Sequence, residues 1–89
     1  MNKIRRKTLA QIVAKLEELE NLRSEIEEML EEVKDEEQEA LDNMPESLQE
    51  SERGQQMQEY IDTMESVLDD LGYIDTEELY SQLQEIVEG

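Results

Sequence analysis

A heptad pattern of apolar residues runs from residue 9 to residue 44 and constrains the fold more than any other feature. Its positions follow one another at steps of three and four, with interruptions at Arg23 and Glu37. The stripe consists of Leu9, Ile12, Leu16, Leu19, Ile26, Leu30, Val33, Ala40 and Met44. This spacing predicts one long amphipathic helix. Because such a helix is marginal in water alone, the stripe must be buried against another helix.

Terminal signals place the long helix at residues 8–42 and leave residues 1–7 outside it as a basic arm. Thr8 followed by Gln11 matches a capping box. A start at Asn2 is the alternative, although four cations at a helix N-terminus oppose the helix dipole. Pro45 disfavours helical geometry in the residue before it, so we expect the helix to end near Asn43 in the left-handed conformation that asparagine tolerates.

A chain reversal is expected at residues 43–51, followed by a second helix at residues 52–71. Pro45 suits the first turn of a new helix, and Ser51 suits the cap of a helix that begins at Glu52. The second helix repeats the steps of four and three, and we expect Gly72 to close it. Its stripe consists of Met57, Ile61, Met64, Leu68 and Leu71.

A third helix is expected at residues 76–88, because Asp75 followed by Glu78 forms another capping-box start. Two arrangements are open: a compact three-helix bundle, or a return limb made of the second and third helices. The long helix would span about 50 Å and the other two ~30 and ~20 Å, so the lengths favour the return limb. We predict a single all-α domain over residues 1–89, an elongated helical hairpin with an interrupted return limb and coiled-coil-like packing.

The composition excludes several kinds of site. The 89 residues include no His and no Cys, so disulfides and the usual zinc, haem and iron–sulfur sites are excluded. Carboxylates occur on every exposed face, so two neighbouring acids do not indicate acid–base catalysis. We therefore expect no enzymatic activity, no cofactor and no metal site. No apolar run approaches a signal peptide or a membrane span, so we expect a cytoplasmic protein without membrane contact.

The predicted core is thin, because aromatic residues make up 3% of the chain and Phe and Trp are absent. Chains of this size often require a partner subunit. Four apolar residues lie beside the main stripes and widen the apolar face beyond what one helix covers. These residues, which predict a homo-oligomer interface, are Leu22, Met29, Tyr60 and Val67. The alternative is a groove for a different protein.

The charge is distributed unevenly along the chain. Residues 1–15 contain five bases and no acid, whereas residues 16–89 contain 26 acids against three bases, a net charge of -23. Carboxylates four residues apart on a helix lie about 6 Å apart, close to the spacing of successive phosphates. The acids that predict a partner-binding surface are Glu27, Glu28, Glu31, Glu32, Asp35, Glu36 and Glu39. Such a surface repels nucleic acid and attracts a basic protein, although high charge can also serve solubility alone.

The reversal carries a sequence signature. Residues 42–49 read Asp-Asn-Met-Pro-Glu-Ser-Leu-Gln, and residues 51–54 read Ser-Glu-Arg-Gly. This signature resembles that of a group of small acidic helical proteins of unknown function from phages, prophages and other bacterial mobile elements. The resemblance covers about residues 3–71 and implies a gene context, without assigning a role to any residue.

Charge and resemblance together favour one function. We expect a non-enzymatic inhibitor that imitates DNA or RNA with its acidic surface and binds a host nucleic-acid-binding or defence protein. A phage-encoded protein of this kind would act in the host cytoplasm. The alternative is a structural, self-associating coiled-coil protein of a phage or mobile-element assembly.

Overall fold

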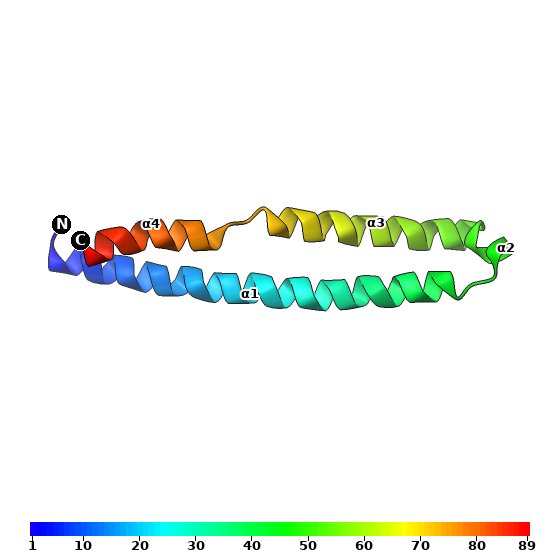
Figure 1. Cartoon of the computed structure of the whole chain (residues 1–89), viewed down its shortest axis with the longest axis horizontal. Helices are drawn as coiled ribbons and strands as arrows, with labels where there is room; N and C mark the ends of the chain where they lie inside the picture. Colours follow the sequence, from blue (N-terminus) through cyan, green and yellow to red (C-terminus); the bar gives the residue numbers. More distant parts are fainter. The chain divides into compact units, whose positions relative to one another are not determined.

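The computed structural model describes all 89 residues and contains only helices. α1 spans Lys3–Asp42, α2 Glu46–Gln49, α3 Glu52–Gly72 and α4 Thr76–Glu88 (Figure 1). α2 is a single turn inside the expected reversal, and the other three helices are those predicted. The prediction of an all-α hairpin with one long helix and an interrupted return limb is confirmed.

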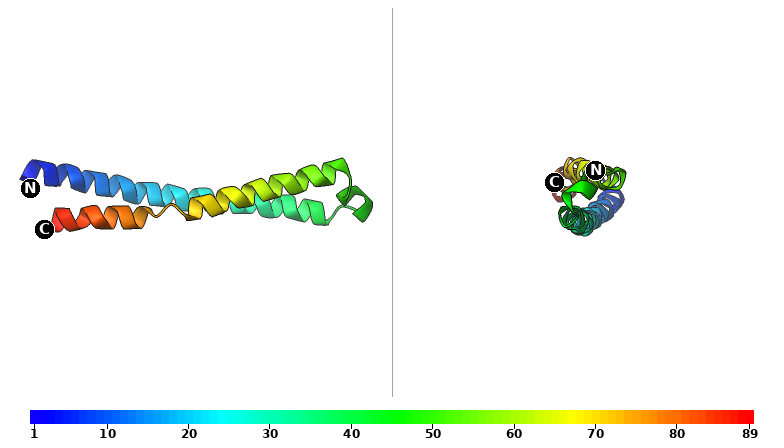
Figure 2. Two further views of the ribbon diagram at one scale, coloured as in Figure 1. Left: turned by 90° about the horizontal axis from the view of Figure 1, so that it is seen from above. Right: turned by 90° about the vertical axis from the view of Figure 1, so that its right-hand side faces the viewer.

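The chain divides into two compact units. Unit 1 consists of Met1–Glu25 and Ile74–Gly89, and unit 2 consists of Ile26–Tyr73. In unit 1, α4 runs antiparallel to the first part of α1 (Figures 1 and 2). In unit 2, the second part of α1 leads through α2 into the antiparallel α3. α1 is one continuous helix that contributes to both units.

α1 begins five residues before Thr8, and the alternative start near Asn2 is the closer description. The Asn2 side-chain oxygen accepts a hydrogen bond from the backbone nitrogen of Arg5 at 2.9 Å, which caps the first turn. The Thr8 hydroxyl instead donates to the carbonyl oxygen of Ile4 at 3.2 Å, one turn back. Most of the basic arm is therefore the first turn of the helix.

The face of α1 that packs inward is offset from the predicted stripe. Except for Gln38, every buried or half-buried residue between 3 and 44 lies on one heptad, which we call the α1 seam. The α1 seam consists of Arg6, Leu9, Val13, Leu16, Glu20, Arg23, Glu27, Leu30, Lys34, Glu37, Leu41 and Met44. The prediction was wrong for Ile12, Leu19, Ile26 and Val33, which are 40–51% exposed, and for Ala40, which is exposed as well. The predicted stripe mixed residues of the α1 seam with apolar residues that directly precede it. The reason is that half of the α1 seam is charged, so the apolar residues alone did not trace it.

The return helices have seams of the same spacing. The predicted stripe of α3 is confirmed, with one addition at its start. The α3 seam consists of Gly54, Met57, Ile61, Met64, Leu68 and Leu71. The α4 seam consists of Thr76, Tyr80, Leu83 and Val87. Few of these side chains are fully covered, since Val13, Leu41 and Ile61 are the only buried large apolar residues of the chain.

The signature residues build the reversal. The carbonyl oxygen of Pro45 accepts hydrogen bonds from the backbone nitrogens of Leu48 and Gln49 at 2.8 and 3.0 Å. As predicted, the Ser51 side chain caps α3, with its oxygen accepting from the nitrogen of Gly54 at 3.4 Å. Gly54 is buried, and a Cβ atom there would lie 2.1 Å from the carbonyl oxygen of Gln49. The reversal therefore requires glycine at this position.

Neither helix end uses the left-handed conformation that we expected. No residue in the chain has a positive φ. Gly72 is the last residue of α3, and Tyr73 caps the helix with φ of -81°. The nitrogens of Asn43 and Met44 donate to the carbonyl oxygens of Glu39 and Leu41, which closes α1 by tightening its last turn.

Candidate interaction surfaces

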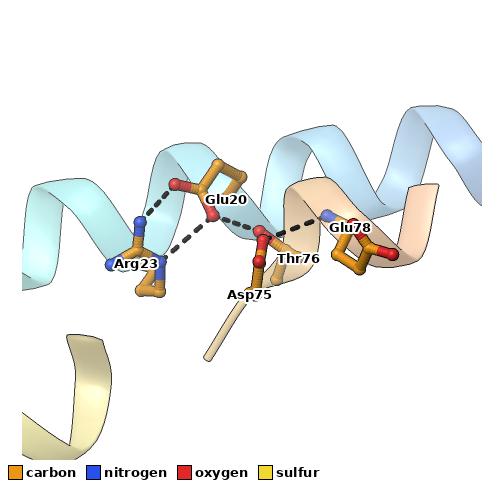
Figure 3. Close-up of polar contacts among 5 residues, drawn as sticks. All are labelled: Glu20, Arg23, Asp75, Thr76 and Glu78. Carbon is orange, nitrogen blue, oxygen red and sulfur yellow. Dashed lines mark hydrogen bonds and ion pairs between the residues drawn. The ribbon is translucent and has the colours of Figure 1, made fainter. Parts of the chain in front are cut away.

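A polar cluster interrupts the apolar packing of unit 1 where α4 begins (Figure 3). Thr76 is fully buried, and its hydroxyl donates a hydrogen bond to the carboxylate of Glu20. The same carboxylate accepts from Nε of Arg23 at 3.1 Å and from a second guanidinium nitrogen. The Asp75 side chain accepts from the backbone nitrogen of Glu78 at 3.0 Å and caps α4 as predicted. The cluster therefore fixes where α4 begins against α1.

Glu20 was not singled out from the sequence, in which Arg23 was noted as an interruption of the apolar stripe. The hydrogen bonds from Arg23 and Thr76 lower the pKa of the Glu20 carboxyl below its ordinary value of 4.5. A lowered pKa means that Glu20 stabilises the folded state at pH values above the unfolded pKa. That stabilisation is lost as the pH falls through the folded-state pKa.

The Glu20→Gln variant tests this linkage. We expect it to be less stable than the wild type at pH 7, and the difference to shrink as the pH falls below 4.5 and through the lowered folded-state pKa of Glu20. Urea unfolding of both proteins at fixed concentration measures the difference. Glu18→Gln, at an exposed acid on the same helix, is the control and should show no such trend. A constant difference between wild type and Glu20→Gln down to pH 3 would contradict the role of the Glu20 charge.

The large apolar residues left exposed on α1, α3 and α4 beyond residue 10 occupy the two heptad positions that border the seam on one side. Each directly precedes a seam residue. In an antiparallel pair, the second helix runs in the opposite direction and is also turned round to face the first. These two changes cancel, so on both helices the residues directly before the seam lie on the same side of the pair. Each unit therefore has one apolar side. It consists of Ile12, Leu19, Leu22, Leu79 and Ile86 in unit 1, and of Ile26, Met29, Val33, Tyr60 and Val67 in unit 2.

All four residues of the predicted oligomer interface belong to these apolar sides. Leu22, Met29, Tyr60 and Val67 are 53%, 68%, 52% and 42% exposed. The other apolar-side residues of α1 were assigned to the core in the sequence analysis, since their spacing alone did not distinguish the two heptads. In unit 1 these residues border a shallow surface depression with Lys15, Leu16 and Glu18.

The positions directly after the seam residues are different in character. On α1, α3 and α4 none of them is a large apolar residue. In unit 2, by the same geometry, they form a polar side with two rows of acids. These rows are Glu28, Glu31 and Asp35 on α1, and Asp62, Glu65 and Asp69 on α3. The three acids on α3 were not predicted as site residues, because their side depends on the antiparallel pairing.

The seven predicted partner-binding acids do not form one surface. Glu28, Glu31 and Asp35 lie on the polar side, while Glu32 and Glu39 point outward from α1 between the two sides. The remaining two lie elsewhere. Glu27 is a half-buried seam residue, and Glu36 lies on the apolar side.

Lys34 is the base that lies next to the polar side of unit 2. Its Nζ lies 3.2 Å from a carboxylate oxygen of Glu31. The hydrogen bond to Glu31 and the nearby charge of Glu65 raise the pKa of Lys34. Glu31 is thus engaged within the unit, whereas Glu28 and Asp35 are exposed.

No group of three or more potential ligand residues is arranged to hold a metal ion. None of the helices combines the length and apolar character needed to cross a membrane. Comparisons with protein-family models, with curated proteins and with solved structures find no match. The two sides of the helix pairs and the distribution of charge are therefore the features that bear on function.

Proposed function

We propose that this protein is a non-enzymatic inhibitor that binds a basic protein surface through the polar side of unit 2. The observation that carries the proposal is the pair of acid rows on antiparallel helices, Glu28, Glu31 and Asp35 facing the same way as Asp62, Glu65 and Asp69. Acids within one row lie about 6 Å apart, and packed helices lie about 8–10 Å apart. Two such rows resemble the phosphates that border a groove of DNA, since groove widths are about 6 and 12 Å.

The partner that fits these rows is a nucleic-acid-binding or defence protein of a host cell. Its basic groove would accept the rows in place of phosphates, and long-range attraction would speed the encounter. The resemblance of the reversal signature to phage and mobile-element proteins supports this class of partner. Under this proposal the protein acts in the host cytoplasm and does not itself contact nucleic acid, because the net charge of -18 repels phosphates.

A charge-reversal variant on the polar side tests the proposal. Glu28→Lys, Asp35→Lys and Asp62→Lys are combined, because all three acids are exposed and none holds the fold through an ion pair within the chain. The control combines Glu18→Lys, Glu25→Lys and Glu39→Lys, which changes the net charge equally on the outward face of α1. Circular dichroism should show that both variants stay helical.

The measurement is capture of proteins from host lysate at about 50 mM and about 500 mM salt, because salt screens attraction between exposed charges. The wild type and the control should capture a nucleic-acid-binding protein at low salt, and added duplex DNA should release it. The polar-side variant should lose at least about tenfold of this capture, a change of ~1.4 kcal/mol. Equal capture by the folded polar-side variant, or capture that duplex DNA does not release, would refute the proposal.

The alternative is a structural, self-associating protein of a phage or mobile-element assembly. The uncovered apolar sides are the observation that favours it, because contiguous exposed apolar surface marks sites of protein association. In this case the lysate would yield mainly the protein itself, and capture would persist at high salt.

A further inference from the structure

We propose that the apolar side of α1 binds a second copy of this chain, with the two α1 helices antiparallel about a two-fold axis near Ile26. The contact would bury the α1 residues at heptad positions Ile12, Leu19, Leu22, Ile26, Met29, Val33 and Ala40. This inference does not rest on the acidic-surface proposal, because it uses the opposite side of the helix pair. It would supply the contact that the structural alternative requires.

A single chain leaves a large area of its surface uncovered. The chain exposes 6943 Å² of surface. A compact monomer of 10.5 kDa exposes about 5400 Å², by the usual scaling of surface with mass. The excess of about 1500 Å² exceeds the ~800 Å² that each partner buries in a standard interface. Val13, Leu41 and Ile61 are the only buried large apolar residues of the chain. Covering the exposed apolar surface would therefore add substantially to the free energy of unfolding.

The apolar residues on this side of α1 have the heptad spacing of a helix that packs along its whole length. The apolar side of α1 advances by three and four from Ile12 to Ala40, and the polar positions within it are Lys15 and Glu36. This spacing is typical of a helix that packs against another helix along its length, as in coiled coils. The same stripe on a second copy of the chain can cover it from end to end, since two identical surfaces meet about a two-fold axis.

Charge selects the direction and the register of the two α1 helices. With the axis near Ile26, Lys15 lies opposite Glu36 of the partner subunit, and Leu22 lies opposite Met29 of the partner subunit. A shift of half a heptad would place Lys15 and Glu36 against apolar residues. A parallel pair would place Lys15 beside Lys15 and Glu36 beside Glu36, which is unfavourable.

The antiparallel direction also accounts for the basic start of α1. Residues 3–7 contain four cations at a helix N-terminus, where they oppose the helix dipole. In the antiparallel pair with the axis near Ile26, Lys7 lies just beyond Asp42 of the partner subunit, the last residue of its α1, and residues 3–6 lie farther out. Attraction between Lys7 and the acidic end of the partner's α1 favours the antiparallel direction.

The first experiment measures mass by light scattering or sedimentation at about 100 µM protein. The wild type should show twice the chain mass of 10.5 kDa. Leu22→Glu should return it to the monomer mass with helicity retained, because Leu22 is 53% exposed in the single chain. Ser24→Glu adds the same charge at an exposed position on the polar side and should leave the dimer intact. A monomeric wild type, or a Leu22→Glu variant that associates as the wild type does, would overturn the proposal.

The second experiment tests the register, and the absence of cysteine from the chain makes it simple. With a short bismaleimide, Ile26→Cys should cross-link to itself, and Leu22→Cys should cross-link well only when mixed with Met29→Cys. Efficient self-linking of Leu22→Cys, equal to that of Ile26→Cys, would establish a parallel pair instead. Lys15→Glu and Glu36→Lys should each weaken association about threefold to tenfold, and combining them in one chain should restore it. No recovery in the combined variant would refute the pairing.

Discussion

Gly54→Ala should lower the free energy of unfolding by about 3 kcal/mol, at the upper end of the cost of overpacking a filled site. The Cβ atom of alanine would lie 2.1 Å from the carbonyl oxygen and 2.6 Å from the carbonyl carbon of Gln49. These are backbone atoms, so no side-chain rotation relieves the conflict. Either α3 moves away from α2, or the Ser51 cap is lost. Urea unfolding followed by circular dichroism, at one fixed protein concentration, measures the change.

Gly72→Ala is the matched control, because Gly72 also lies in α3 and nothing is within 4 Å of its added Cβ atom. Its φ is not positive, so alanine adopts the same backbone conformation without strain. We expect this variant to be more stable than the wild type by about 0.5–1 kcal/mol, since alanine restricts the unfolded chain. A Gly54→Ala variant within 0.5 kcal/mol of the wild type would mean that α2 and α3 do not approach as closely as the structure indicates.

The glycine pair illustrates what the sequence could and could not predict. Local signals sufficed for Ser51 and Asp75, because a cap depends on residues within one turn of the chain. The role of Gly54 could not be predicted, since it arises from contact with the backbone of Gln49 in another helix. The choice between Thr8 and Asn2 as the start of α1 was likewise open, because both are acceptable caps. The capping box of Thr8 with Gln11 and the basic residues between the two positions both argued for Thr8.

The heptad spacing of the α1 seam was predicted correctly. Over part of the helix, however, the prediction assigned the seam to residues one position too early. Following apolar residues from Leu16 leads to Leu19, whereas the seam continues to Glu20, which bonds to Thr76 of α4. A charged residue in a seam cannot be recognised from its own helix, because its partner lies far away in the sequence. The same limit applies to the two sides. Leu22 and Met29 were recognised as lying beside the stripe, but their alignment with Tyr60 and Val67 follows only from the antiparallel pairing.

Ile61→Ala should lower the free energy of unfolding by about 2–4 kcal/mol, the usual cost of truncating a buried isoleucine. Ile61 is 3% exposed and is, with Leu41, one of two buried large apolar residues in unit 2. A core this small has no other side chains to compensate for the cavity. Glu59→Ala, at an exposed position of the same helix, should change stability by less than about 0.5 kcal/mol.

Amide hydrogen exchange in Ile61→Ala distinguishes local from general destabilisation. Most contacts of Ile61 lie within its own unit, because the chain packs as two compact units. The loss of packing should therefore destabilise unit 2 more than unit 1. We expect exchange to accelerate most in α3 and in the part of α1 after Ile26, and least in α4. Val13→Ala truncates the one buried large apolar residue of unit 1 and should give the reverse pattern, with acceleration greatest in α4. Equal acceleration in α3 and α4 in both variants would show that the two units unfold together, with the continuous α1 transmitting the loss from one to the other.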